Sequence, residues 1–324
     1  MFEKLKLFIE KYDFFIITTH DPADADGIGA QLVVASILNK EKKQYRIINS
    51  SPKPEHFIFM DRYNIIEQWD REKHGDLPEQ GGAIIVDTAD LHFTGQIRDA
   101  ICRSQEIFVI DHHETKPNST FSGIYDPSAA STCEITVELA KEAGILLDSD
   151  TALAAYTGII YDTGFFAYPK TGPGTFRAAL TLLELGVNPN EAYRQLCENA
   201  ATRVLFLQKK ALASLTLHFE DRVAVQVLRK EDFIEAGALP EDTYGFVNFP
   251  LKAKEIIVSL LIKETPGKKI LCSLRSKGSA NVAKIAQDLG GGGHINAAGF
   301  NSTMDIDQTL SIALTMISKY MEKP

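Results

Sequence analysis

The run "EIFVIDHH" (residues 106–113) decides the fold of the first half of the chain, because a short apolar stretch ends abruptly in three side chains that can bind metals. Comparable β-rich runs occur at "FFIITT" (14–19), "QYRII" (44–48) and "GAIIVDT" (82–88). The intervening segments have helical patterns, and we expect helices at "DGIGAQLVVASILNK" (26–40) and "TGQIRDAICRS" (94–104). Near-continuous apolar strands that alternate with helices indicate an α/β domain with a parallel, Rossmann-like sheet covered on both faces.

Polar side chains follow these strands at the point where each strand ends. His20 follows the first run, Asp87 lies near the end of the "GAIIVDT" run, and Asp111, His112 and His113 end the last. In a parallel sheet, ligands bind beyond the carboxyl ends of the strands. We therefore expect residues from three separate strands to meet at one edge of the sheet.

The length and the later pattern predict two domains. A chain of 324 residues exceeds the usual size of one domain. The pattern is helical from 131 to about 215, including one long helix over 190–215, and strands then return. We predict a catalytic metal-binding domain over 1–200, a helical linker over 201–217 and a smaller mixed α/β domain over 218–324.

The composition is that of an ordinary globular protein, with 44% hydrophobic and 24% charged residues. The formal net charge of −9 argues against sequence-independent binding to long nucleic acids, because that mode needs a basic surface. A nucleic-acid substrate should therefore be short. The apolar runs are too short to span a membrane, and the N-terminus reads as an amphipathic helix without a signal peptide. We expect a cytoplasmic protein; a homodimer is compatible with the sequence. The scattered cysteines predict reduced thiols: Cys102, Cys133, Cys197 and Cys272.

The segment "HDPADADG" brings His20, Asp24 and Asp26 together. Taken alone, it could be an Asp-rich turn that caps a helix. With Asp87 and Asp162 added, so many acids near one sheet edge would be unfavourable unless cations neutralise them. Carboxylates and imidazoles without thiolates suit Mn²⁺, or Mg²⁺ or Co²⁺, better than structural Zn²⁺. Such a set can hold two divalent cations that share a bridging carboxylate.

The order and spacing of five segments resemble the motifs of the DHH phosphoesterase family and its DHH-associated C-terminal domain. These segments are "HDPADADG" (20–27), "VDTAD" (86–90), "DHH" (111–113), "YDTG" (161–164) and "GGGGHINAAGF" (290–300). The resemblance implies metal-dependent hydrolysis of phosphate esters. Within the family it is greatest to the nano-RNase group, which degrades very short oligonucleotides and dephosphorylates adenosine 3′,5′-bisphosphate.

The resemblance also implies a role for each motif residue. His20 and Asp24 would hold one cation, the second would be held by Asp26, His112 and Asp162, and Asp87 would bridge the two. Asp111 would orient a metal-binding imidazole, as ligand histidines usually require. His113 would face the substrate and donate to a phosphate oxygen or assist the leaving group.

The C-terminal segment predicts a phosphate-binding site. The glycines of 290–293 permit positive φ angles, so their successive N–H groups can form an anion-binding nest. Arg275 offers a planar fork for a terminal phosphate. The predicted substrate contacts are Arg275, Ser276, Gly291, Gly292, Gly293 and His294.

Other residues have two interpretations. Phe166 and Tyr168 could stack on a base, but aromatic packing in the core is at least as consistent with the pattern. Ser131, Thr132 and Glu134 are interpreted first as a helix cap and second as phosphate contacts.

The resemblance therefore implies a two-metal phosphoesterase that hydrolyses short oligonucleotides such as pApA to mononucleotides, with adenosine 3′,5′-bisphosphate as a further substrate. Two alternatives stay open at this point. One is a cyclic dinucleotide phosphodiesterase. The other is a non-catalytic nucleotide sensor that uses metals only to bind its ligand.

Overall fold

The computed structural model divides the chain into two compact units, Met1–Asn199 and Ala200–Pro324. It describes residues 1–75, 77, 80–113, 121–265, 267 and 269–321, and the side chain of His294 lies outside this description. Each unit contains one six-stranded sheet.

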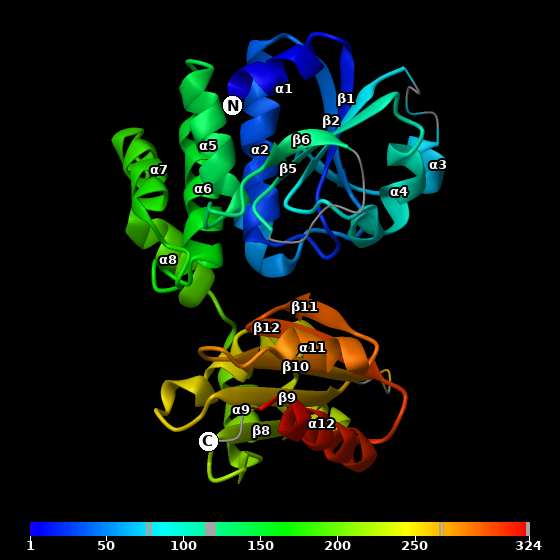
Figure 1. Ribbon diagram of the computed structural model, residues 1–324, viewed down its shortest axis with the longest axis vertical. Helices are drawn as coiled ribbons and strands as arrows, with labels where there is room; N and C mark the ends of the chain where they lie inside the picture. The colour runs from blue at the N-terminus through cyan, green and yellow to red at the C-terminus, as the bar shows by residue number, and fades with distance from the viewer. Residues whose placement is uncertain (76, 78–79, 114–120, 266, 268, 322–324) are drawn as a thin grey trace. The chain divides into compact units, whose positions relative to one another are not determined.

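The sheet of the first unit is parallel throughout, with the strand order β3-β2-β1-β4-β5-β6 (Figure 1). Its strands are β1 (Phe14–Thr18), β2 (Gln44–Asn49), β3 (Ile66–Gln68), β4 (Gly82–Val86), β5 (Glu106–Asp111) and β6 (Ser122–Tyr125). The central strand β1 pairs Ile17 with Ile47 of β2 and with Ile84 of β4. The predicted parallel sheet is confirmed. The short edge strands β3 and β6 were not predicted, because runs of three and four residues carry little periodicity.

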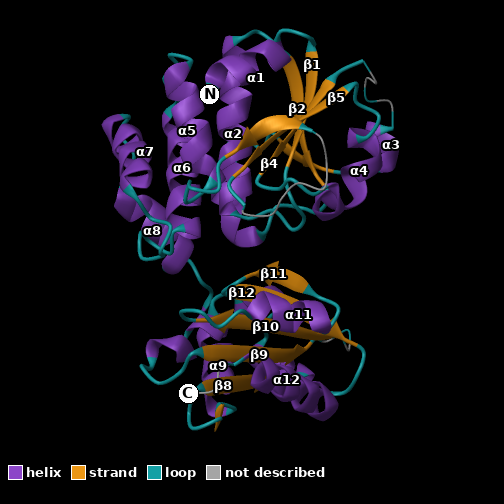
Figure 2. Cartoon of the chain, viewed as in Figure 1, coloured by secondary structure: helices purple, strands orange, loops and turns teal. Residues whose placement is uncertain are grey.

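Helices cover both faces of this sheet (Figure 2). They are α1 (Phe2–Ile9), α2 (Ala25–Lys40), α3 (Arg71–His74), α4 (Arg98–Ile101), α5 (Thr132–Glu142), α6 (Ser149–Asp162), α7 (Pro173–Glu184) and α8 (Pro189–Cys197), with 3-10 helices η1 (Glu55–Met60) and η2 (Leu91–Ile97). Successive residues of β4 face opposite cores: Ile84 packs in the cluster that contains α2, and Ile85 packs in the cluster that contains Ile101 of α4.

The helix expected over 94–104 is shorter than predicted. That segment holds the end of η2, which has a kink at Gly95 with φ of 67°, and then the four-residue α4. A positive φ interrupts a right-handed helix, and glycine adopts it readily. Among the described residues, no helix is both long and apolar enough to cross a membrane.

The second unit has a mixed sheet with the order β11-β12-β10-β9-β8-β7, in which only β8 and β9 pair in parallel. Its strands are β7 (Thr216–His218), β8 (Val223–Leu228), β9 (Val258–Glu264), β10 (Ile270–Ser276), β11 (Gly292–His294) and β12 (Ala297–Ser302). Its helices are α9 (Thr202–Ala213), α10 (Lys230–Ala236), α11 (Val282–Asp288) and α12 (Ile306–Tyr320), with η3 (Pro240–Thr243), η4 (Phe246–Asn248) and η5 (Pro250–Lys252). Cys272 and Leu274 of β10 share a core with Ile285 of α11 and Ile317 of α12, so alternation along β10 places Arg275 on the opposite face.

The single helix expected over 190–215 is wrong. The chain leaves α8 after Cys197 and enters α9 at Thr202, and Ala201 between them has an extended backbone. Leu207 of α9 packs in a buried cluster with Phe233 of α10. The helix within the range predicted as a linker therefore belongs to the core of the second unit.

Candidate metal centre

The first group of potential ligands lies where β1 leads into α2. His20 Nε2 lies 3.6 Å from Asp24 Oδ1 and 3.3 Å from Asp87 Oδ2. Asp24 is the N-cap of α2 and accepts a hydrogen bond of 3.0 Å from the Gly27 N–H. One ligand atom from each of His20, Asp24 and Asp87 lies within 4.8 Å of the others, which is close enough for one cation to contact all three.

The second group joins three elements that are far apart in the sequence. Asp26 lies in the first turn of α2, His112 follows β5, and Asp162 is the last residue of α6. His112 Nε2 lies 3.1 Å from Asp162 Oδ2 and 4.0 Å from Asp26 Oδ2. These three residues also present ligand atoms within 4.8 Å of one another.

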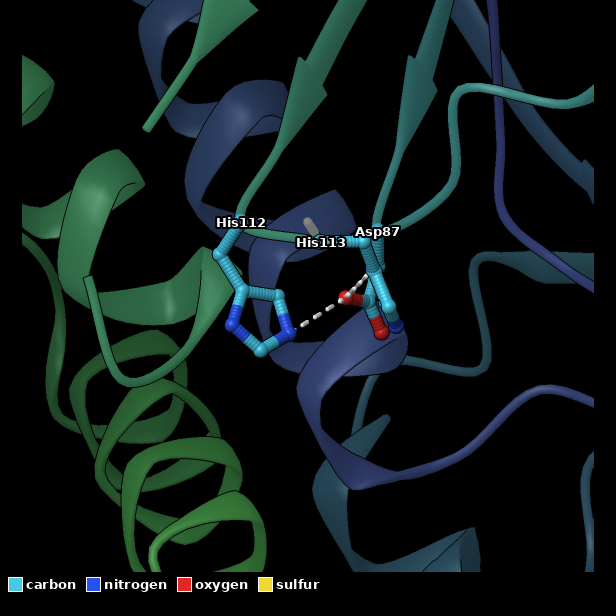
Figure 3. A group of neighbouring side chains, drawn as sticks. All are labelled: Asp87, His112 and His113. Atoms are coloured by element: carbon cyan, nitrogen blue, oxygen red, sulfur yellow. Dashed lines mark ion pairs between the residues drawn. The ribbon is translucent and has the colours of Figure 1, made fainter. Parts of the chain in front are cut away.

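Asp87 stands between the two groups. Its Oδ2 lies 3.3 Å from His20 Nε2. Its Oδ1 lies 3.5 Å from His112 Nε2, and Figure 3 marks this ion pair with a dashed line. The residue follows β4 with φ of 62°, a left-handed conformation that Asp tolerates better than most residues with a Cβ. The two oxygens of one carboxylate thus face different imidazoles, as a bridging ligand requires.

The N-terminus of α5 donates hydrogen bonds to two of the acidic side chains. The backbone N–H groups of Thr132 and Cys133 donate to the two oxygens of the fully buried Asp26 at 2.6 and 2.8 Å. The Thr132 hydroxyl donates to Asp87 Oδ1 at 2.9 Å. A helix N-terminus favours negative charge, so α5 stabilises the carboxylates within the fold.

Sequence reasoning recognised only part of this support. Ser131 is the N-cap of α5 and accepts from the Glu134 N–H at 3.0 Å, as a cap should. Thr132, in contrast, contacts two candidate ligands. A Thr in the first turn of a helix carries no sequence signal for that role, because Asp26 lies 106 positions earlier in the chain.

Asp111 contacts a different imidazole from the one we expected. Its Oδ1 lies 2.6 Å from Nδ1 of His113, and it also accepts from the His113 N–H at 3.2 Å. The Nδ1 of His112 instead lies 3.4 Å from the Ala129 carbonyl oxygen. Asp111 therefore orients His113, the imidazole expected to face the substrate. The Ala129 carbonyl contacts His112, which is the role that we expected for Asp111.

The charges of the site are strongly coupled. Burial, followed by the neighbouring Asp87 and Asp162, raises the pKa of Asp26 well above its ordinary value. Burial lowers the pKa of His112, but the carboxylates of Asp162, Asp87 and Asp26 outweigh it and raise that pKa to about 10. The same balance of burial against Asp24 and Asp87 raises the pKa of His20. Without cations, the repulsion among the acids is reduced because the pKa values of Asp26, His20 and His112 are all raised and these groups retain protons more readily.

These residues fit divalent cations. Carboxylate oxygens and imidazole nitrogens are the donors that Mn²⁺, Mg²⁺ and Co²⁺ accept, and a cation would replace the protons as the balancing charge. All six side chains predicted as ligands lie in the two groups described above, and a third group of possible ligands joins Asp87 with His112 and His113. Their assignment to particular ions remains a prediction.

Two of the predicted phosphate contacts lie at the end of β10 in the second unit. Arg275 is half-buried, and its Nη1 donates to the Leu274 carbonyl at 3.0 Å. The Ser276 hydroxyl donates to the Ala280 carbonyl at 2.5 Å and accepts from the Asn296 amide at 2.9 Å. Ser276 therefore fixes the turn after β10, and its contact with substrate stays a prediction.

The nest predicted over 290–293 is wrong for its first two glycines. Gly290 has φ of 79°, and its N–H donates to the Gln287 carbonyl at 3.0 Å, while the Gly291 N–H donates to the Ala286 carbonyl at 2.8 Å. This pair of bonds is a Schellman cap that ends α11. Gly292 and Gly293 belong to β11, which pairs with β12. The first half of the glycine run thus terminates a helix, which the pattern of glycine after an amphipathic helix could have indicated.

The two aromatic residues after the fourth motif have different surroundings. Phe166 packs against the core of the first unit and stacks on Phe176, with ring centroids 5.1 Å apart. The core interpretation is confirmed for Phe166. Tyr168 is exposed.

Comparison with known families assigns both parts of the chain. Residues 14–159 match the N-terminal domain of the DHH family, and residues 220–323 match the DHHA1 domain. The chain therefore contains a DHH family N-terminal domain followed by a DHHA1 domain. The resemblance drawn from the motifs is confirmed.

Individual relatives are similar over nearly the whole chain. The chain is 28% identical to the bifunctional oligoribonuclease and PAP phosphatase NrnA of Thermus thermophilus, covering 95% of this chain and 90% of the relative. It is 25% identical to the cyclic-di-AMP phosphodiesterase GdpP of Bacillus subtilis, covering 98% of this chain but only 49% of that protein. The crystal structure of an exopolyphosphatase-related protein from Bacteroides fragilis superposes with a TM-score of 0.92 at 25% identity, covering 98% of this chain and 96% of that chain. That likeness agrees with the predicted α/β fold.

Proposed function

We propose that this protein is a two-metal phosphoesterase that hydrolyses short oligonucleotides such as pApA to mononucleotides, and adenosine 3′,5′-bisphosphate to AMP. The observation that carries the proposal is the pair of adjacent ligand groups: the first contains Asp87, and Oδ1 of Asp87 lies 3.5 Å from His112 of the second. The names of the NrnA relatives, which join an oligoribonuclease with a PAP phosphatase activity, supply the substrate class.

Six side chains would hold the cations, for which we propose Mn²⁺: His20, Asp24, Asp26, Asp87, His112 and Asp162. When bound, two divalent cations supply Lewis acidity toward the phosphate oxygens and activate water for attack at phosphorus. The protein keeps the donor atoms in place before the cations arrive, since Asp26 is fixed by two N–H groups of α5.

His113 is the residue that we assign to the substrate. The short contact between its Nδ1 and Asp111 fixes the ring orientation and favours a proton on Nδ1. The ring is also 3.8 Å from Asp87 Oδ1, so it lies at the metal centre itself. With Nδ1 bonded to Asp111, the ring can donate from Nε2 to a phosphate oxygen or to the leaving oxygen when it is the imidazolium, which carries a proton on both nitrogens.

We further propose that Arg275 and His294 bind the far phosphate of the substrate. The register supports this pairing, because Ala297 of β12 is the partner of both Arg275 in β10 and His294 in β11. The two positions thus flank the same residue across the sheet. The planar fork of an arginine suits a terminal phosphate dianion, and the strand that contains His294 lies one strand beyond β12.

The test is hydrolysis of a substrate panel with Mn²⁺ and then with EDTA: pApA, a longer RNA oligonucleotide, adenosine 3′,5′-bisphosphate and cyclic di-AMP. Metal-dependent release of AMP from pApA, which decreases with oligonucleotide length, is the expected result. A clear preference for cyclic di-AMP would instead support the activity named for the GdpP relative. Binding of pApA with no turnover of any substrate would refute the enzymatic proposal.

A further inference from the structure

A group of exposed aromatic rings follows the candidate ligand Asp162. The side chains of Phe165, Tyr168 and Tyr193 are 43%, 53% and 45% exposed. The rings of Phe165 and Tyr193 meet edge to face, with centroids 5.6 Å apart. We call these three residues the aromatic patch.

The backbone that carries Phe165 is strained and well fixed. Gly164, Phe165 and Phe166 have consecutive φ angles of 53°, 58° and 65°. Such left-handed values are unfavourable for residues with a Cβ, and they persist only where surrounding contacts hold them. Here the Phe165 N–H donates to the Ile160 carbonyl at 2.7 Å, and the Phe166 N–H donates to the Thr163 hydroxyl at 3.1 Å. The loop therefore holds the Phe165 ring outward at a conformational cost.

The neighbouring rings are equally constrained. A Cβ placed on Gly164 would come within 2.5 Å of the Tyr168 ring, so that ring lies directly on the Gly164 backbone. Phe166, between the two exposed rings in sequence, is anchored by its stacking on Phe176. A ligand that binds rings already held in this way loses little conformational entropy.

The patch lies within reach of the metal centre. Phe165 is three residues from Asp162, and three residues span at most about 10 Å. That distance is comparable with the length of one nucleotide. A phosphate at the metal centre could therefore carry its base to the aromatic patch.

We propose that Phe165 and Tyr168 form a stacking platform for the base attached to the phosphate that is held at the metal centre. This inference rests on the proposed function. A ring face recognises every base, so the platform would select for a nucleotide over a bare sugar phosphate without selecting a sequence. The competing occupant is a second copy of this chain, because exposed Phe176, Leu180 and Leu183 extend an apolar stripe along α7.

The test measures the affinity of AMP and of ribose 5-phosphate in the presence of Mn²⁺ by calorimetry, together with KM for pApA. Phe165→Ala removes the ring and keeps a Cβ at the left-handed position, so the backbone cost is unchanged. Phe165→Tyr retains a ring. The matched control is Tyr63→Ala, which removes a ring that is 67% exposed and lies beside Asp150, at the other end of α6 from Asp162.

We expect Phe165→Ala to weaken AMP binding about 10-fold and to raise KM for pApA similarly, with ribose 5-phosphate unaffected. Phe165→Tyr and Tyr63→Ala should match the wild-type protein.

Equal weakening of AMP and ribose 5-phosphate binding by Phe165→Ala would overturn the proposal, since the loop would then act on the metal centre rather than on the base. Unchanged affinities with an altered oligomeric state in size-exclusion chromatography would identify a self-association surface instead. A wild-type protein that neither binds AMP nor hydrolyses pApA would refute the proposed function, and the platform with it.

Discussion

Replacing Asp87 by Asn tests whether one carboxylate serves both ligand groups. Asn has the same shape, tolerates the φ of 62° at this position and can still accept from the Thr132 hydroxyl. It lacks the charge and one of the two oxygens that face His20 and His112. We therefore expect both cations to bind more weakly while the fold is retained.

The size of the effect follows from linkage between metal binding and folding. A cation at a free concentration about 1,000 times its Kd stabilises the folded protein by ~4 kcal/mol. In a unit of the size of Met1–Asn199, 1 kcal/mol corresponds to about 2–4 °C in Tm, so the wild-type protein should gain roughly 8–16 °C per site. If Asp87→Asn weakens a site about 100-fold, the gain falls to ~1.4 kcal/mol, or about 3–6 °C.

The assay is thermal unfolding with and without Mn²⁺, and the quantity compared is the increase in Tm. The increase is used because burial raises the pKa of Asp87 but His20, His112 and His113 outweigh it and lower that pKa, so the ionised form of Asp87 also stabilises the metal-free protein. Asp90→Asn is the matched control, since Asp90 lies three residues further on and caps η2 through the His92 N–H. An undiminished increase in Asp87→Asn, or an equal reduction in Asp90→Asn, would refute the role of Asp87 as a shared ligand.

Three further predictions concern other contacts. Because the pKa of His112 is raised to about 10, its ring is protonated in the metal-free protein at neutral pH, and a cation must displace that proton. The Mn²⁺ affinity measured by calorimetry should therefore fall as the pH is lowered from about 8 to about 6. A constant affinity over this range would contradict this reasoning. Thr132→Val should weaken Mn²⁺ binding about 10- to 100-fold through the lost bond to Asp87, while Thr132→Ser should restore it. Gly290→Ala should lower the free energy of unfolding of the second unit by about 1–2 kcal/mol in urea, because φ is 79° there. Gly292→Ala, at a position with open space and an ordinary φ, should have a smaller effect, and equal losses would argue against the cap.

The sequence predicted the metal-bearing sheet because its signals are local. Each apolar run of β1, β4 and β5 is followed within a few residues by a polar side chain, and parallel strands place such residues at one edge. No long-range information was needed for that inference. The breaks were harder to predict: the kink at Gly95 and the break between α8 and α9 lie inside segments that were each expected to form one helix.

The contacts that orient the ligands could not be predicted in the same way. Asp111 and His113 bond to each other although they are only two residues apart, and adjacency alone does not distinguish His112 from His113 as the partner. The choice depends on where the Ala129 carbonyl lies, and β6 and the turn before α5 determine that position. Every residue has a backbone carbonyl, so the residue type at 129 does not indicate this contact.

The acidic centre can form before any cation binds because its opposing charges are built into the fold. Asp26 and Asp87 are almost completely buried, which would be prohibitive for isolated carboxylates. The N–H groups of Thr132 and Cys133 donate hydrogen bonds to Asp26. The imidazoles of His20 and His112 contact Asp87. The imidazoles would give up protons on cation binding, whereas the N–H groups of α5 would remain in place. The same arrangement thus tolerates both states, with the positions of the donor atoms set by the backbone and the charge balance set by exchangeable protons.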